Sequence, residues 1–161
     1  MKTLNSAENY IGSQFKIARI GEPIPCGMKI DSPVLAFDYW NQFVKTKEWF
    51  DDMKEHLVVL TLNTRYEVSG FSLISMGSLN ESIAHPRDIL RPVLISASYA
   101  FILVHNHPSG NAAPSEADHR LTRRICEAGT LMQVSMLDHV IVAVPNENST
   151  GYFSFKEAGI V

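Results

Sequence analysis

Two histidines, a serine and an aspartate in the middle of the sequence are the residues best suited to chemistry. His105 and His107 are separated by one residue at the end of a short apolar run, and Ser115 and Asp118 follow after a segment rich in proline and glycine. In an extended strand, side chains at positions i and i+2 point to the same side. Both imidazoles can therefore offer a nitrogen atom to a single metal ion.

Asp118 is the third predicted ligand. A helix that begins near Ser115 carries an apolar stripe at helical spacing, and Asp118 lies on the flank of that stripe. We expect this helix to bury Ala117, Leu121, Ile125 and Ala128. Two histidines and one aspartate leave a fourth tetrahedral position open, which is typical of a catalytic zinc site. We therefore predict that His105, His107 and Asp118 bind one Zn²⁺ ion.

These residues also have structural interpretations. Ser115 and Asp118 have nearly the spacing of a helix capping box, and that pair alone favours a structural cap. The histidines and the serine–aspartate pair together favour a metal site, because several independent requirements are met at once. Asp138 and His139, at the start of a later strand, can either orient a metal ligand or belong to the core.

The surrounding sequence predicts strands and helices that alternate around one sheet, in the α/β or α+β class. Residues 1–30 carry weak periodicity and are predicted to form an N-terminal arm, with the folded domain at 31–161. Helices are predicted near residues 33–44, 85–100 and 115–128. Strands are predicted at residues 57–62, 68–75, 101–105, 132–136, 139–144 and 152–155.

Composition limits the classes of function. A chain of 161 residues with 45% apolar and 19% charged residues fits one compact domain. Its net charge of -3 argues against strong direct binding to DNA, although His119, Arg120, Arg123 and Arg124 lie on one basic helix face. No apolar run is long enough to span a bilayer, and the N-terminus lacks the features of a signal peptide. The two cysteines form no CxxC pair, so we expect a cytoplasmic protein without membrane association.

Several segments of the sequence resemble one known family. The pattern H-x-H-(seven residues)-S-x-x-D, which starts at His105 and ends at Asp118, resembles the JAMM motif of JAB/MPN-domain metalloproteases. Four longer segments resemble the bacterial RadC-like branch: SLNESIAHPRDI (78–89), HNHPSG (105–110), PSEAD (114–118) and LDHVIV (137–142). The resemblance covers about residues 57–155. It implies a mixed β-sheet flanked by helices, related to the fold of the zinc cytidine deaminases.

The resemblance also implies roles for individual residues. The two histidines and the aspartate would bind Zn²⁺, and the Ser115 hydroxyl would contact the metal-bound water or the oxyanion. An upstream glutamate would act as general base, and the RadC-like pattern implies it near Ser72. The nearest acids are Glu67 and Glu81, and we predict Glu67, whose alternative role is that of an exposed carboxylate in a turn. A deaminase is disfavoured because the sequence lacks H-x-E and P-C-x-x-C.

The leading prediction is a zinc-dependent metallopeptidase or isopeptidase that hydrolyses a peptide or an isopeptide-linked protein. Because a general base typically adds about 10²- to 10⁴-fold in rate, a chain without one would be a slow enzyme. The first alternative is therefore an MPN-type scaffold that binds metal without catalysis. The second is a role in DNA repair, which only the traditional association of RadC-like proteins suggests.

Overall fold

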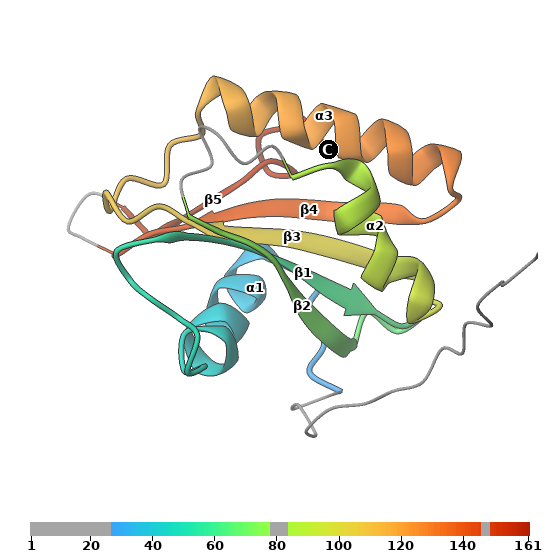
Figure 1. Ribbon diagram of the computed structural model, residues 1–161, viewed down its shortest axis with the longest axis horizontal. Coiled ribbons are helices and arrows are strands. Elements are labelled where there is room, and N and C mark those ends of the chain that lie inside the picture. The colour runs from blue at the N-terminus through green and yellow to red at the C-terminus, as the bar shows by residue number, and fades with distance from the viewer. Residues whose placement is uncertain (1–26, 78–83, 146–148) are drawn as a thin grey trace, which may run out of the picture.

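The computed structural model describes residues 27–77, 84–145 and 149–161, which form one β-sheet with helices on both faces (Figure 1). The strands are β1 (Glu55–Leu62), β2 (Val68–Gly77), β3 (Ala100–Asn106), β4 (Ser135–Val142) and β5 (Tyr152–Ser154). The helices are α1 (Pro33–Tyr39), continued by the π-helical turn η1 (Trp40–Val44), then α2 (Pro86–Ile95) and α3 (Glu116–Leu131). The predicted mixed sheet flanked by helices is confirmed. None of these helices is both long and apolar enough to cross a membrane.

The strand order is β2-β1-β3-β4-β5. Strands β3 and β4 run parallel, whereas the other neighbouring pairs are antiparallel. Parallel neighbours need a crossover connection, and α3 supplies it. The C-terminal end of β3, the C-terminal end of β4 and the N-terminal end of β1 therefore meet at one edge of the sheet, where α3 begins.

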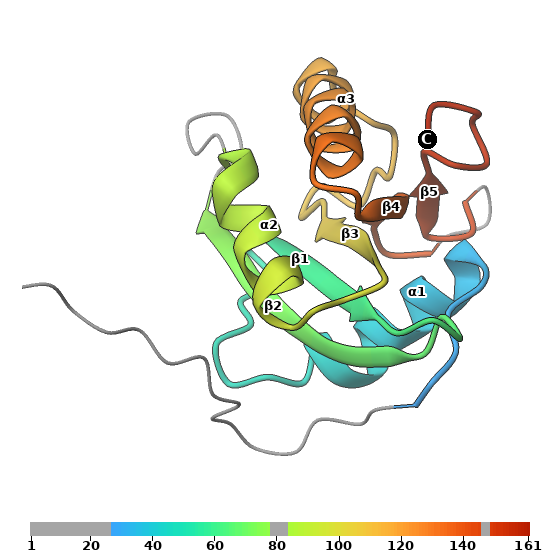
Figure 2. The same ribbon diagram turned by 90° about the vertical axis from the view of Figure 1, so that its right-hand side faces the viewer.

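The sheet has an apolar core on each face, because alternate side chains of its central strands point in opposite directions. Helix α1 covers one face, and α2 and α3 cover the other (Figure 2). The side chains toward α1 include Val58, Leu60, Ile102, Val104 and Val140. Those toward α2 and α3 include Leu57, Val59, Phe101 and Leu103. His105 continues the second series along β3, and Asn106 continues the first.

Two helices end at other residues than the sequence pattern predicts. Helix α3 extends to Leu131, and one strand, β4, replaces the two predicted at 132–136 and 139–144. The helix stops because Gln133 adopts a positive φ of 56° and the Val134 N–H donates to the Gly129 carbonyl at 2.9 Å. Helix α2 ends at Ile95 rather than at residue 100, with Pro92 accommodated inside it.

Candidate metal centre

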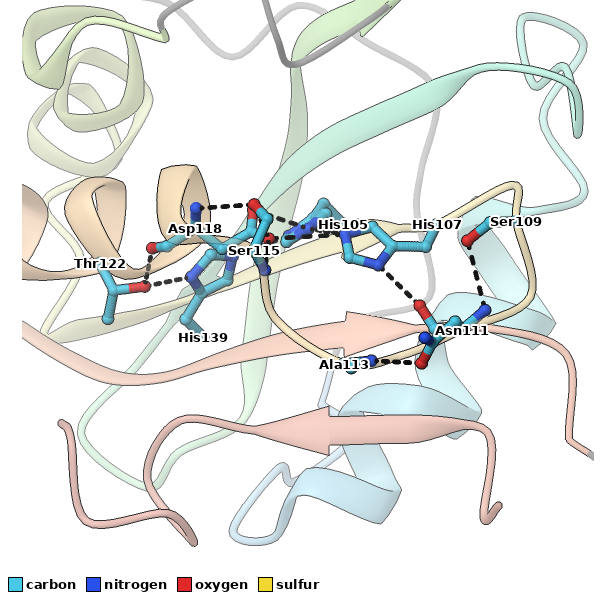
Figure 3. A network of polar contacts seen from close by, with 9 residues as sticks. All are labelled: His105, His107, Ser109, Asn111, Ala113, Ser115, Asp118, Thr122 and His139. Carbon is cyan, nitrogen blue, oxygen red and sulfur yellow. Dashed lines mark hydrogen bonds and ion pairs between the residues drawn. The ribbon is translucent and has the colours of Figure 1, made fainter. Parts of the chain in front are cut away.

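The three predicted ligands lie together at the C-terminal end of β3, beside the first turn of α3 (Figure 3). His105 Nε2 is 3.0 Å from His107 Nε2 and 3.2 Å from Asp118 Oδ1. His107 Nε2 is 3.6 Å from Asp118 Oδ2. His105 and Asp118 are buried, and the His107 side chain is 12% exposed. The structure thus brings together three residues that the sequence places on two different elements.

The separations of the three donor atoms fit a divalent cation. In a tetrahedral zinc site with bonds of about 2.0–2.1 Å, neighbouring ligand atoms lie about 3.3 Å apart. Here the two histidine nitrogens lie 3.0 Å apart, and the Asp118 carboxylate approaches His105 with Oδ1 at 3.2 Å and His107 with Oδ2 at 3.6 Å. Two imidazole nitrogens and a carboxylate oxygen are also a donor set that suits zinc. One donor atom from each of the three residues lies within 4.8 Å of the other two, so the group could hold a metal ion.

Asp118 is held as an ionised carboxylate by its neighbours. Burial alone would raise its pKa, but the neighbouring imidazoles of His105 and His107 outweigh burial and hold that pKa well below its usual range. The Ser115 hydroxyl donates to Asp118 Oδ2 at 2.6 Å, and the Ser115 backbone N–H donates to the same oxygen at 2.7 Å. The Asp118 N–H in turn donates to Ser115 Oγ at 3.2 Å. Asp118 is thus both a member of the capping box and the predicted ligand, and the cap orients its carboxylate.

The buried face of α3 differs from the predicted one. Its buried residues are Asp118, Thr122, Ile125 and Gly129, whereas Ala117, Leu121 and Ala128 are half-buried. The stripe is rotated by one position because hydrogen-bonded polar side chains occupy part of the inner face. Asp118 consequently lies at the centre of the buried face rather than on its flank.

His107 is oriented by the loop that follows it. Its Nδ1 lies 2.7 Å from the Asn111 carbonyl oxygen, which can only accept, so Nδ1 carries the proton and donates. The unprotonated Nε2 then faces His105 and Asp118. Burial lowers the pKa of His107, but Asp118 and the Asn111 carbonyl favour the protonated ring, outweigh burial and raise the pKa above its ordinary value.

A third histidine supports the cluster from β4. His139 Nε2 lies 2.8 Å from His105 Nδ1, and His139 Nδ1 lies 2.7 Å from Thr122 Oγ1. Burial holds the pKa of His139 well below its ordinary value, which keeps the ring neutral. The sequence left open whether Asp138 and His139 orient a metal ligand or belong to the core. His139 contacts a predicted ligand, His105. Asp138 faces elsewhere, because its carboxylate accepts from the Ser154 hydroxyl at 2.6 Å.

Asn106, between the two histidines, is not part of the cluster. Its side chain lies on the opposite side of β3, where Nδ2 donates to the Lys54 carbonyl at 2.9 Å. Its Oδ1 accepts from the His56 backbone N–H at 2.8 Å. These two bonds fix the chain immediately before and after Glu55.

Glu55 is the carboxylate that the sequence analysis missed. Leu57 of β1 pairs with His105 in the antiparallel register, so Glu55 lies opposite His107. Alternation along β1 places its side chain on the same face as Leu57, toward α2 and α3. Its negative charge is one of the causes that raise the pKa of His107. The implied position, Ser72, pairs with Val59 on the far side of β1 from β3 and is not opposite the ligands.

Glu67 does not reach the cluster, which corrects its prediction as the general base. It lies at the β1–β2 turn, where its carboxylate accepts from Asn63 Nδ2 at 2.8 Å and pairs with Arg65 at 2.9 Å. The β1–β3 register places this turn beside Ala100, about 17 Å along β3 from His105. Glu67 is therefore a turn carboxylate, and the other acid considered, Glu81, lies outside the described residues.

Comparison with known proteins identifies relatives over most of the chain. A family model of the RadC-like JAB domain matches residues 30–160. A curated UPF0758 protein of Pelodictyon phaeoclathratiforme is 43% identical over 111 residues, which cover 69% of this chain and 48% of that protein. A UPF0758 protein of Trichlorobacter lovleyi is 37% identical over 133 residues, which cover 83% of this chain and 54% of that protein. A UPF0758 protein of Rubrobacter xylanophilus is 43% identical over 108 residues, which cover 67% of this chain and 45% of that protein.

The chain spans about half the length of these curated relatives. The match to the family model, in contrast, runs from the segment before α1 to residue 160 and includes the whole histidine–aspartate cluster. On that match, the chain belongs to the RadC-like JAB domain family.

Proposed function

We propose that the protein is a zinc-dependent metallopeptidase or isopeptidase. The observation that carries the proposal is the convergence of His105, His107 and Asp118 at separations suited to a tetrahedral ion, with Glu55 opposite His107 on the neighbouring strand. A divalent cation held by these three side chains lowers the pKa of water and polarises a carbonyl group, which is the chemistry that amide hydrolysis needs.

Glu55 is the residue we assign as general base. Its carboxylate accepts the proton of the attacking water and returns it to the leaving amine. Three features support this role: its place opposite His107, its orientation toward the ligand face, and the clamp by which Asn106 fixes the residues on either side of it. A base in this position accounts for activity without Glu67.

Ser115 is the residue we assign to the oxyanion. Its hydroxyl donates to Asp118 Oδ2 in the structure, but the Ser115 backbone N–H also holds that oxygen, at 2.7 Å. The hydroxyl can therefore turn toward a substrate without releasing the carboxylate. Ser115 is exposed, so its hydroxyl is accessible to the negative charge that develops on the carbonyl oxygen of a substrate.

The test combines metal analysis with a cleavage screen. Protein purified without added zinc is expected to contain one zinc ion per chain and to cleave members of a peptide and isopeptide panel in a chelator-sensitive way. Glu55→Gln should retain the zinc and lose about 10²- to 10⁴-fold in rate. Glu67→Gln is the matched control and should cleave like the unchanged protein.

Two results would contradict the proposal. Zinc content near zero that does not rise on adding zinc would remove the metal site itself. Zinc at one ion per chain without cleavage of any panel member would instead favour the scaffold, which keeps the ligands and lacks turnover.

A further inference from the structure

We propose that Thr122 and His139 are positioning residues that fix the tautomer of His105 and thereby set the affinity of the site for its metal. This inference rests on the proposed metal site and concerns residues that do not touch the ion. The contacts form a chain that starts at the backbone of one ligand, Asp118, and ends at the ring of another, His105.

We assign the direction of the first two hydrogen bonds from the single hydrogen of the Thr122 hydroxyl. Thr122 Oγ1 lies 2.7 Å from the Asp118 carbonyl oxygen, which can only accept, so the hydroxyl donates to it. A hydroxyl has a single hydrogen. Toward His139 Nδ1, at 2.7 Å, Thr122 Oγ1 must therefore accept, and the proton is on His139 Nδ1.

The same reasoning extends to the ligand. A neutral His139 with its proton on Nδ1 presents a bare Nε2, which accepts from His105 Nδ1 at 2.8 Å. His105 consequently carries its proton on Nδ1. The lone pair of His105 Nε2 is then directed at His107 and Asp118, as metal binding requires.

In the part of the chain that the structure describes, packing buries all three side chains of this chain of bonds. The side chains of His105, Thr122 and His139 are all 0% exposed, so water cannot replace a lost contact. The His139 ring also stacks on Phe155, with ring centroids 4.9 Å apart and an angle of 9° between the planes. The ring is therefore held in plane while Thr122 selects which of its nitrogens carries the proton (Figure 3).

Loss of the Thr122 hydroxyl should lower the affinity for the metal, although the side chains of His139 and His105 lie between Thr122 and the proposed site. Without that acceptor, His139 is free to carry its proton on Nε2 and donate to His105 Nδ1. His105 would then carry its own proton on Nε2, the atom that must bind the ion. Metal binding has to reverse this arrangement, and loss of such a supporting contact typically weakens metal affinity about 10- to 100-fold.

The first experiment titrates the whole chain with Zn²⁺ against a chromophoric chelator. Thr122→Val keeps the shape of the side chain without the hydroxyl and should weaken zinc binding about 10- to 100-fold. Thr122→Ser keeps the hydroxyl and should bind within about threefold of the unchanged protein. The matched control is Thr61→Val, which removes another buried hydroxyl, one that donates to the Gly70 carbonyl at 3.0 Å, and should not change zinc affinity.

The second experiment reads the tautomers directly, by nitrogen NMR of the imidazoles in the metal-free unchanged protein at alkaline pH. His105 and His139 should both carry their protons on Nδ1. A proton on Nε2 of His105 would overturn the inference, as would a Thr122→Val protein that folds and binds zinc like the unchanged one. If the unchanged protein binds no zinc, the proposed function fails, whereas the NMR result still decides whether the tautomers are set in this way.

Discussion

Replacing Asn106 with alanine should lower the stability of the fold at the N-terminal end of β1 without weakening metal binding. Asn106 stands between two ligands in the sequence, is 7% exposed, and bonds the backbone on both sides of Glu55. The alanine variant leaves the buried His56 N–H without its acceptor, which costs about 1–3 kcal/mol. It also removes the bond to the carbonyl of the exposed Lys54, worth about 1 kcal/mol net. The expected loss in the free energy of unfolding is therefore about 2–4 kcal/mol.

The assay is thermal unfolding of the metal-free protein together with a zinc titration. For a chain of this length, about 1 kcal/mol corresponds to about 2–4 °C in Tm, so Asn106→Ala should lower Tm by about 4–16 °C. Zinc affinity should stay within about threefold, because the side chain points away from His105. The control is Asn41→Ala, which removes an exposed amide that donates to the Phe37 carbonyl at 3.0 Å and should lower Tm by less than about 2 °C.

The reasoning would be refuted by either of two results for Asn106→Ala. A Tm within about 2 °C of the unchanged protein would mean that the hydrogen bonds of Asn106, including the 3.3 Å contact of its Oδ1 with His56 Nδ1, do not hold the N-terminal end of β1. A complete loss of zinc binding in a folded variant would mean that Asn106 belongs with the ligands.

Three further predictions concern the cluster and the helix above it. The pKa of His107 is raised above 6.5, and a proton on its Nε2 must leave before a metal ion binds. Zinc affinity should therefore fall about tenfold per pH unit as the pH drops below that pKa. A zinc affinity that stays constant from pH 8 to 5.5 would contradict this prediction. Ser115→Ala should cost about 1 kcal/mol of stability through the lost cap, measured by denaturation. Zinc binding, measured by chelator competition, should stay within about threefold, because the Ser115 backbone N–H still holds Asp118 Oδ2; an unchanged stability would contradict this prediction. Gly129→Ala, a change that normally stabilises a helix, should destabilise this protein by about 1–3 kcal/mol, measured by urea denaturation. The reason is that the added Cβ would lie 2.6 Å from the Val134 carbonyl oxygen. A more stable variant would show that the backbone at Val134 moves to make room for the methyl group.

The convergence of the two histidines with Asp118 was predictable because local patterns encode it. A strand end fixes the relation of His105 to His107, and the first turn of a helix fixes that of Ser115 to Asp118. The bond of Thr122 to His139 was not predictable. The buried face of α3 is partly polar, and apolar periodicity cannot reveal a face that is held by hydrogen bonds.

The carboxylate opposite the ligands was missed for a different reason. Glu55 reaches the cluster only through the antiparallel register of β1 with β3, strands separated by β2 and α2 in the sequence. No local pattern in a single sequence shows which strand becomes the neighbour of β3. Glu67 was chosen for its closeness in sequence to the implied position, but the hairpin turn places it at the opposite end of the sheet.

The parallel pairing of β3 with β4 has a consequence for how the activity can change. Among the described residues, the groups that would bind the ion and those hydrogen-bonded to them belong to the single unit β3–α3–β4, residues 100–142, whereas Glu55 comes from β1. On the proposed function, holding the metal and turning over a substrate would thus depend on separate parts of the chain. One substitution at Glu55 could silence a family member and leave its metal in place, so zinc content alone is a poor guide to which members are active enzymes.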